Sequence, residues 1–182
     1  MLGQFKLSFI FLILIMSIQT MSIFKFSADA SMKRWQTIND GVMGGLSKSS
    51  LSISDDGHGQ FSGHVSLANN GGFASVRLLT DVKVNPENQK IVLQIKGDGK
   101  KYQFRLKSEN DQNHSYIQEF KTTGEWQAID LDLKDFKPQF RGRQLDMPNF
   151  NFSTIKEIRF LIANKKEEKF TLLIDSINLE EK

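Results

Sequence analysis

Apolar and polar residues alternate along most of the chain between residues 23 and 182, and no stretch there repeats with the period of an amphipathic helix. Successive side chains of a strand point to opposite faces, so this alternation predicts β-strands with one buried face. Such runs occur at residues 23–26, 60–67, 73–79, 91–96, 102–107, 115–121, 126–131, 157–163 and 169–179. Many short strands separated by turn residues predict an all-β jelly-roll sandwich.

One turn sequence, Gly97-Asp98-Gly99, lies between two of the clearest runs. Glycine adopts positive φ without strain, so this turn predicts a hairpin that joins the strands on either side of it. The alternation places Arg105 on the outward face of the second strand. The residues expected to point inward are Ile91, Leu93, Ile95, Tyr102, Phe104 and Leu106.

The longest stretch without alternation runs from residue 134 to residue 152 and contains Pro138 and Pro148. An irregular segment of this length in a compact domain usually has a function or covers a sheet. Trp35 and Trp126 are expected in the core, and the alternative for both is an exposed platform on which a sugar ring stacks.

The first 22 residues differ from the rest of the chain. Lys6 precedes an apolar run at residues 7–18, which has the length of a signal-peptide core and is short for a bilayer span. The sequence therefore predicts a signal peptide or N-terminal membrane anchor over residues 1–22 and one domain over residues 23–182, exported or anchored in a periplasmic or other extracytoplasmic space. The alternative is a mitochondrial or cytoplasmic protein whose true start is Met21. Cleavage after Ala30 would remove the apolar run at residues 23–26.

Composition and spacing exclude several kinds of chemistry. The chain has no cysteine, so it has neither disulfides nor thiol catalysis. Its net charge of +3 is spread along the chain, whereas a nucleic-acid surface concentrates Lys and Arg on one face. The three histidines lack metal-ligand spacing, and Ser47 stands where a phosphate-binding loop needs glycine before Lys48. We therefore expect no enzyme activity, no metal, no cofactor and no nucleic-acid partner.

Three stretches carry more specific information. They are Asn-Asp-Gly-Val-Met-Gly-Gly at residues 39–45, Asn-Asn-Gly-Gly at residues 69–72 ahead of Arg77, and Phe-Arg-Gly-Arg at residues 140–143 together with the Gly-Asp-Gly turn and Trp126. In order and spacing the chain from residue 23 to residue 179 resembles the domain of complex I intermediate-associated protein 30. The resemblance implies a galactose-binding-domain-like jelly roll. It also implies a non-catalytic, chaperone-like factor for the assembly of NADH:ubiquinone oxidoreductase (complex I).

The candidate residues for binding a partner or ligand are Asn39, Asp40, Met43, Asn69, Asn70, Arg77, Arg105, Phe140, Arg141 and Arg143. Two interpretations stay open for residues 39–45: a buried loop that latches the edge of the sandwich, or an exposed contact surface. For Arg141 and Arg143 the alternatives are a partner contact and ion pairs with Asp132 or Asp135 that hold the loop in place.

The expected function is the binding of a protein partner, such as a respiratory-complex subunit or another assembly factor, through protein–protein contacts. The alternative is a carbohydrate-binding jelly-roll module outside the cytoplasm, which the signal-like start and the aromatic residues favour. An uncleaved N-terminal segment would associate either protein with a membrane.

Overall fold

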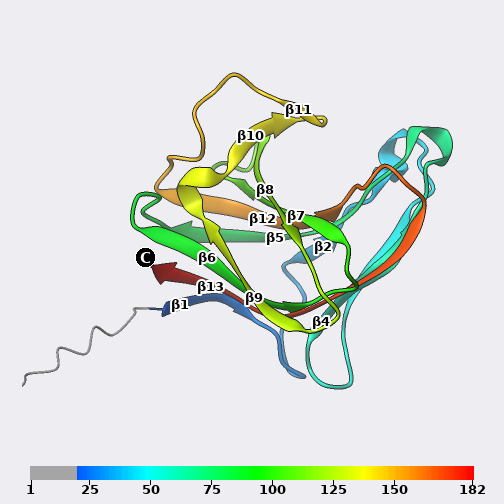
Figure 1. Cartoon of the computed structure of the whole chain (residues 1–182), viewed down its shortest axis with the longest axis horizontal. Coiled ribbons are helices and arrows are strands. Elements are labelled where there is room, and N and C mark those ends of the chain that lie inside the picture. Colours follow the sequence, from blue (N-terminus) through cyan, green and yellow to red (C-terminus); the bar gives the residue numbers. More distant parts are fainter. Residues whose placement is uncertain (1–19) are drawn as a thin grey trace, which may run out of the picture.

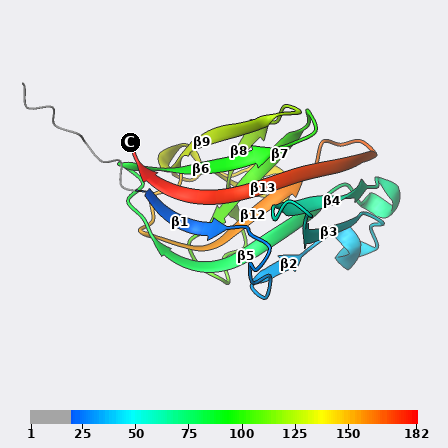
Figure 2. The same ribbon diagram turned by 90° about the horizontal axis from the view of Figure 1, so that it is seen from below.

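Two antiparallel β-sheets pack face to face in the computed structural model, which describes residues 20–182 (Figure 1). The six-stranded sheet has the order β3 (Lys48–Ile53), β4 (Gly59–Val65), β13 (Glu168–Glu181), β6 (Gln89–Lys96) and β9 (Trp126–Asp132), with β1 (Thr20–Lys25) also paired to β13. The seven-stranded sheet has the order β11 (Arg143–Gln144), β10 (Lys137–Phe140), β8 (Ser115–Lys121), β7 (Lys101–Lys107), β12 (Thr154–Ile162), β5 (Ala74–Lys83) and β2 (Trp35–Thr37). Three single 3-10 turns complete the fold: η1 (Asp40–Met43), η2 (Ala68–Asn70) and η3 (Leu133–Asp135). Figure 2 shows the layer of β6 and β13 lying over that of β5 and β12, and the predicted all-β sandwich is confirmed.

The predicted signal peptide or anchor falls mostly on residues 1–19, which lie outside the described residues. Strand β1 begins at Thr20, and its first three residues pair with residues 178–180 of β13. Within the described part of the chain, no helix has the length and the apolar character needed to cross a membrane.

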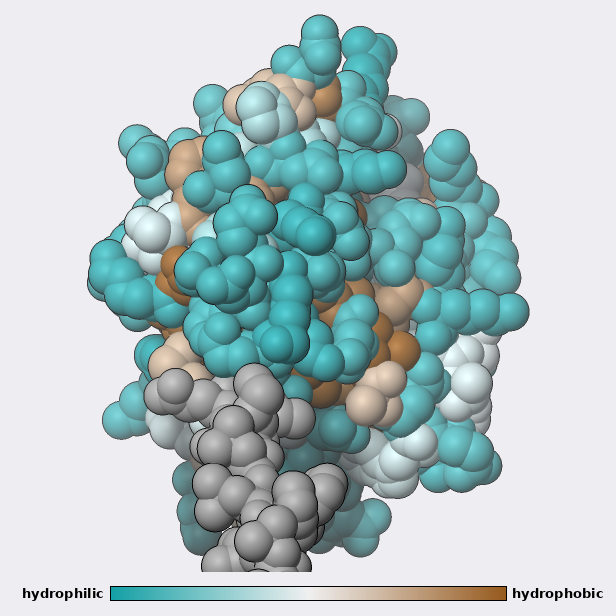
Figure 3. All heavy atoms as spheres, turned by 60° about the vertical axis from the view of Figure 1, so that its left-hand side comes forward, coloured by the Kyte–Doolittle hydropathy of each residue, from teal (hydrophilic) through white to brown (hydrophobic). Residues whose placement is uncertain are grey.

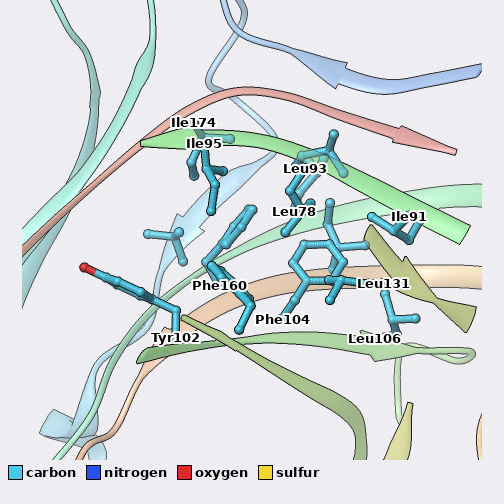
Figure 4. Packing of buried hydrophobic residues seen from close by; sticks show 14 of the residues in the cluster. Leu78, Ile91, Leu93, Ile95, Tyr102, Phe104, Leu106, Leu131, Phe160 and Ile174 are labelled. Carbon is cyan, nitrogen blue, oxygen red and sulfur yellow. The ribbon is translucent and has the colours of Figure 1, made fainter. Parts of the chain in front are cut away.

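The core lies between the two sheets. The six residues of β6 and β7 that alternation places inward are all buried, with exposed fractions of at most 1%. Figure 4 shows Phe104 and Phe160 of the seven-stranded sheet pointing toward Ile95 and Ile174 of the other sheet. The two phenyl rings pack edge to face with their centroids 5.0 Å apart. Because burying one such side chain stabilises the fold by about 1.5–3 kcal/mol, the facing rows hold the two sheets together.

The turn at Gly97-Asp98-Gly99 does not close a hairpin, so that prediction is wrong. Strand β6 belongs to the six-stranded sheet and β7 to the seven-stranded one, and the turn carries the chain between the sheets. A Cβ on Gly97 would come within 2.3 Å of the Thr122 side chain, so this crossing is tightly packed. Alternation shows which side chains face the core, but it does not show whether consecutive strands pair with each other or face each other across the core.

Four short strands, β2, β3, β10 and β11, do not stand out in the alternation pattern. Strands β10 and β11 form a small hairpin inside residues 134–152, so the expectation of an irregular segment is wrong for residues 137–144. Pro138 lies in β10, where proline is tolerated because the strand is short and close to the sheet edge. Figure 1 shows this hairpin at the rim of the seven-stranded sheet.

Candidate functional site

The ten candidate residues fall into three separate places in the fold. Two loops at one end of the sandwich contain Asn39, Asp40, Met43, Asn69 and Asn70. The outer face of the seven-stranded sheet carries Arg77 and Arg105. The β10–β11 hairpin contains Phe140, Arg141 and Arg143. The structure therefore does not bring all ten residues into one site.

The Asp40 carboxylate links the two glycine-rich loops. It is 6% exposed, and its Oδ2 accepts hydrogen bonds from the Ser47 hydroxyl (2.5 Å) and from the backbone N–H groups of Gly72 (2.7 Å) and Phe73 (3.3 Å). Its Oδ1 accepts a fourth hydrogen bond from the Ser47 backbone N–H (3.1 Å). Burial alone raises the pKa of Asp40, but these four hydrogen bonds outweigh burial, and the net pKa is lower than the ordinary value.

Two glycines leave room for this carboxylate. A Cβ on Gly45 would lie 2.4 Å from the Asp40 carboxyl carbon, and a Cβ on Gly71 would lie 2.7 Å from Oδ2. Any larger residue at either position would displace the carboxylate from its donors. The pattern of glycines around Asp40 in both loops therefore follows from the space that the side chain needs.

The asparagines of the two loops also bond within the fold. The Asn39 side-chain oxygen accepts from the Ser49 hydroxyl (2.7 Å), and the Asn69 amide donates to the Gly44 carbonyl (3.1 Å). Asn69 and Asn70 both have positive φ, a conformation that asparagine tolerates better than most residues. Met43 ends turn η1, and its side chain lies outside the described part of the structure. These contacts agree with the latch interpretation of residues 39–45.

Three arginines lie side by side on the outer face of the seven-stranded sheet. Arg159 of β12 is the direct cross-strand neighbour of Arg77 in β5 on one side and of Arg105 in β7 on the other. Side chains opposite each other in this way have their Cβ atoms about 5 Å apart, and like charges there repel. We call the outward surface of β5, β12 and β7 around these three side chains the arginine face.

Glu157 neutralises part of this charge. It is 2% exposed although it points to the outer face, and it is held between two of the arginines. Arg77 Nη1 donates to Glu157 Oε2 (3.1 Å), and Arg159 Nη2 donates to Oε1 (2.8 Å). Arg77 also donates from Nε and Nη2 to the Gln36 side-chain oxygen of β2 (3.0 and 2.8 Å). The side chains on this half of the face are therefore fixed before any ligand arrives.

Arg105 lacks such a carboxylate. Its Nε and Nη2 donate to the Gln103 side-chain oxygen (3.0 and 2.5 Å), and no ion pair of Arg105 occurs among residues 20–182. Glu119, the acid whose charge acts on Arg105, accepts hydrogen bonds from Lys101 Nζ (2.8 Å) and from the Gln103 amide (3.0 Å). Burial, followed by repulsion from Arg159, lowers the pKa of Arg105 to about 10.

The arginine face is suited to binding. Beneath the polar side chains, Ile117 and Leu161 are buried although alternation places them on the outer face. Guanidinium and amide groups of fixed orientation supply several hydrogen-bond donors and acceptors at once. Guanidinium groups stay charged near neutral pH, so the arginines of this face are poorly suited to transferring protons.

Arg77 and Arg105 are among the site residues predicted from the sequence, whereas Glu157, Arg159 and Gln103, which complete the same network, are not. A signal for two of them exists in the sequence, because Glu157 and Arg159 are charged residues at alternate positions of the otherwise apolar stretch from residue 157 to residue 162. Their position between the other two arginines depends on the order of strands in the sheet, which the sequence pattern does not show.

The β10–β11 turn presents an exposed aromatic and two arginines. Arg141 and Gly142 both have positive φ, as in two-residue hairpin turns, and the Arg141 guanidinium lies 5.3 Å from the centre of the Phe140 ring. Asp132 pairs with Lys182. Across the described residues neither Arg141 nor Arg143 forms an ion pair, so the expected alternative of pairing with Asp132 or Asp135 is not observed.

A second aromatic lies on the outer face of the six-stranded sheet. Trp126 is 43% exposed, so the expectation of a core position is wrong for it, whereas Trp35 is buried as expected. The Trp126 ring packs on His58, with 4.5 Å between centroids, and His58 Nδ1 lies 3.3 Å from Asp175 Oδ1. A pocket of about 400 Å³ lies beside His58 and Asp175. Among residues 20–182, no group of His, Asp or Glu is arranged to hold a metal ion.

Elsewhere the surface carries both hydrophilic and hydrophobic side chains. Figure 3 shows one side of the molecule, on which hydrophilic side chains cover most of the area and hydrophobic atoms lie in small groups between them. Large hydrophobic residues are exposed at several places along the chain, at Met21, Leu46, Leu67, Leu79, Trp126, Phe140, Met147 and Phe152. Apolar side chains scattered in this way are normal for a protein surface, so the polar networks above are the more specific features.

Comparisons with known proteins place this fold. The family model described as complex I intermediate-associated protein 30 (CIA30) matches residues 24–174. Among solved structures, the family 11 carbohydrate-binding module of the cellulosomal cellulase Lic26A-Cel5E of Clostridium thermocellum is similar with a TM-score of 0.67 and 17% identity, over 91% of this chain and 96% of that one. The same kind of module in complex with a mixed-linked tetrasaccharide gives a TM-score of 0.61 at 20% identity, over 85% and 94% of the two chains.

A family 29 carbohydrate-binding module is similar with a TM-score of 0.53 and 13% identity, over 90% of this chain and 89% of that one. No curated protein matches the chain. At these identities the solved structures show the fold alone, and they confirm a jelly-roll sandwich of the galactose-binding-like type.

Proposed function

The chain belongs to the family of complex I intermediate-associated protein 30, and from this membership we propose that it is a non-catalytic binding protein that holds a partner protein while a membrane complex is assembled. The partner we propose is a respiratory-complex subunit or another assembly factor. The observation that carries the proposal is the exposed β10–β11 turn, where, within the described part of the chain, Phe140 and two arginines without ion pairs project from the rim of the sheet.

Arginine and aromatic residues dominate the binding energy of many protein interfaces, because each provides a large contact area together with hydrogen bonds or cation–π contacts. The two-residue turn fixes the backbone that carries Phe140, Arg141 and Arg143. A fixed backbone lowers the entropy cost of binding. The turn therefore provides a small, rigid contact surface with a positive charge.

The test reverses this charge. We expect the double substitution Arg141→Glu and Arg143→Glu to abolish capture of the partner from the protein's own cells, detected by crosslinking and mass spectrometry, while thermal stability changes little. The matched control is the double substitution Lys33→Glu and Arg34→Glu, an exposed basic pair outside the proposed surface. Equal loss of capture in the control, or loss of stability in the turn variant, would contradict the proposal.

A second candidate function is carbohydrate binding, and the arginine face is the observation that favours it. The guanidinium and amide groups of Arg77, Arg105, Gln36 and Gln103 are held by hydrogen bonds on the face of a jelly-roll sheet. Planar polar groups of fixed orientation are suited to sugar hydroxyls. The similar solved structures described above are carbohydrate-binding modules, which supports this candidate through the fold only.

Calorimetric titration with a broad panel of oligosaccharides tests this candidate. Binding that is weakened by Arg77→Ala but not by Lys48→Ala would support the arginine face as the ligand surface. Failure of every oligosaccharide to bind would refute the second candidate and leave protein binding as the function.

Both candidates fit a protein that acts outside the cytoplasm, and we propose that residues 1–22 form a signal peptide or membrane anchor ahead of the domain of residues 23–182. Cleavage after residue 22 would remove the three residues that begin β1, whereas an uncleaved anchor would keep them. Mass spectrometry of the protein purified from its own cells would give the mature N-terminus, and detection of the intact first residues in the cytoplasm would contradict export.

A further inference from the structure

The arginine face has fewer acidic than basic side chains. Glu157 is shared between Arg77 at Oε2 and Arg159 at Oε1, and among the described residues it accepts no hydrogen bond from Arg105. Glu119 is occupied by Lys101 and Gln103. Within the described residues, Arg105 therefore has only the neutral side-chain oxygen of Gln103 as its acceptor.

The groups around Arg105 also experience this excess of positive charge. Burial lowers the pKa of Lys107, and Arg159 and Arg77 lower it further, although Glu157 acts in the opposite direction. Burial and then Lys107 lower the pKa of His114. A negatively charged group bound at Arg105 would offset the repulsion between Arg105 and Arg159.

We propose that Arg105 binds the carboxylate of an acidic oligosaccharide, a uronate, that lies on the arginine face. This inference rests on the second candidate function, carbohydrate binding. Guanidinium and carboxylate groups match in geometry and form paired, charge-assisted hydrogen bonds. No hydrogen bond from Arg105 Nη1 occurs within the described residues, so this nitrogen is available to a ligand.

A sugar fits this position better than an acidic protein segment. Gln36 lies beside Arg77 at one end of the arginine row, and Gln103 lies beside Arg105 at the other. Their side-chain oxygens already accept from these arginines, but each amide nitrogen retains an N–H group that can donate to a sugar hydroxyl. The site lies on the face of paired strands and not at a sheet edge, so a peptide cannot add to it as an extra strand.

The experiment compares two matched ligands by calorimetry. One is a galacturonate hexamer, and the other is the same hexamer with its carboxylates reduced to alcohols. We expect the acidic hexamer to bind at least tenfold more tightly than the reduced one. Arg105→Gln should remove this preference, and Arg105→Lys should keep part of it because a lysine retains the charge. The control Lys48→Gln removes one exposed positive charge on β3 of the other sheet and should change the affinity less than twofold.

The outcomes separate the two proposals. Equal binding of both hexamers, unchanged by Arg105→Gln, would overturn the uronate inference and leave carbohydrate binding intact. If neither hexamer binds, the uronate inference is overturned, and carbohydrate binding is then decided separately by the oligosaccharide panel described above. A hexaglutamate peptide serves as a third ligand. Its binding through Arg105 in place of the galacturonate hexamer would assign the site to an acidic protein segment and overturn the sugar assignment. Circular dichroism and thermal melting of each variant verify that it is folded.

Discussion

Replacement of Asp40 tests whether the latch between the two glycine-rich loops stabilises the fold. Asp40→Asn keeps the size of the side chain but removes the charge and turns an N–H₂ group toward backbone donors. Three backbone N–H groups, those of Ser47, Gly72 and Phe73, then lose a charged acceptor. Hydrogen bonds to charged groups contribute about 1.5–3 kcal/mol each, but bonds that share one acceptor do not add fully. On this basis we expect a total loss of about 3 kcal/mol.

A loss of this size is a large fraction of the about 5–15 kcal/mol that stabilises a typical domain. Urea denaturation of the wild type and of Asp40→Asn at pH 7 measures it directly. The matched control is Asp111→Asn, which neutralises an exposed aspartate in the β7–β8 connection and should change stability by less than about 0.5 kcal/mol.

The pH dependence provides a second measurement. The folded pKa of Asp40 lies below the ordinary value of 3.8, so the stabilisation is fully present above pH 3.8 and is lost as the pH falls through the folded pKa. The difference between wild type and Asp40→Asn should therefore shrink in strongly acidic solution. A cost below about 1 kcal/mol at pH 7, or a cost that does not shrink in acid, would refute the latch.

Two further substitutions have defined outcomes. Gly97→Ala places a Cβ 2.3 Å from Thr122 in the crossing between the sheets and should cost about 2–3 kcal/mol in urea denaturation, whereas Gly124→Ala, with open space around it, should be neutral. A neutral Gly97→Ala would mean that the crossing is loosely packed. Arg105→Met should raise stability at pH 7 by about 1 kcal/mol. Burial and Arg159 lower the pKa of Arg105 to about 10, which means that folding disfavours the charged guanidinium. The full pKa shift corresponds to about 3 kcal/mol, and solvent screening reduces this cost to the smaller value expected. Thermal melting against an Arg34→Met control measures this gain, and a lower melting temperature for Arg105→Met would show that the guanidinium stabilises the fold.

The inward-facing residues could be predicted from the sequence because burial acts on single side chains. Ile91, Leu93 and Ile95 have no polar atoms to hydrate, so their alternation directly reports a buried face. The pairing of β6 and β7 could not be predicted in this way. A strand that faces its neighbour across the core and a strand that pairs with it show the same pattern of apolar residues.

The candidate site shows the same difference between local features, which the sequence pattern reveals, and strand order, which it does not. Asp40 could be assigned to a tight turn because Asn, Asp and Gly have local conformational preferences. The arginine face depends on three strands that are distant in sequence, and only their register brings Arg159 between Arg77 and Arg105. Trp126 was misplaced because its indole covers His58 on the outer surface, a contact that no local pattern reveals.

Strand β13 determines when the six-stranded sheet can form as the chain is synthesised. It is 14 residues long and pairs with β1, β4 and β6, all of which precede it in the chain. Until β13 leaves the ribosome, this sheet exists only as two separate pairs, β3 with β4 and β6 with β9, and β1 has no partner strand among the described residues. About 100 residues lie between the end of β4 and the start of β13, which at typical synthesis rates is roughly 5–20 s of translation. During that interval the strand edges that β13 later covers are open, so they can pair with other chains and expose the nascent chain to aggregation.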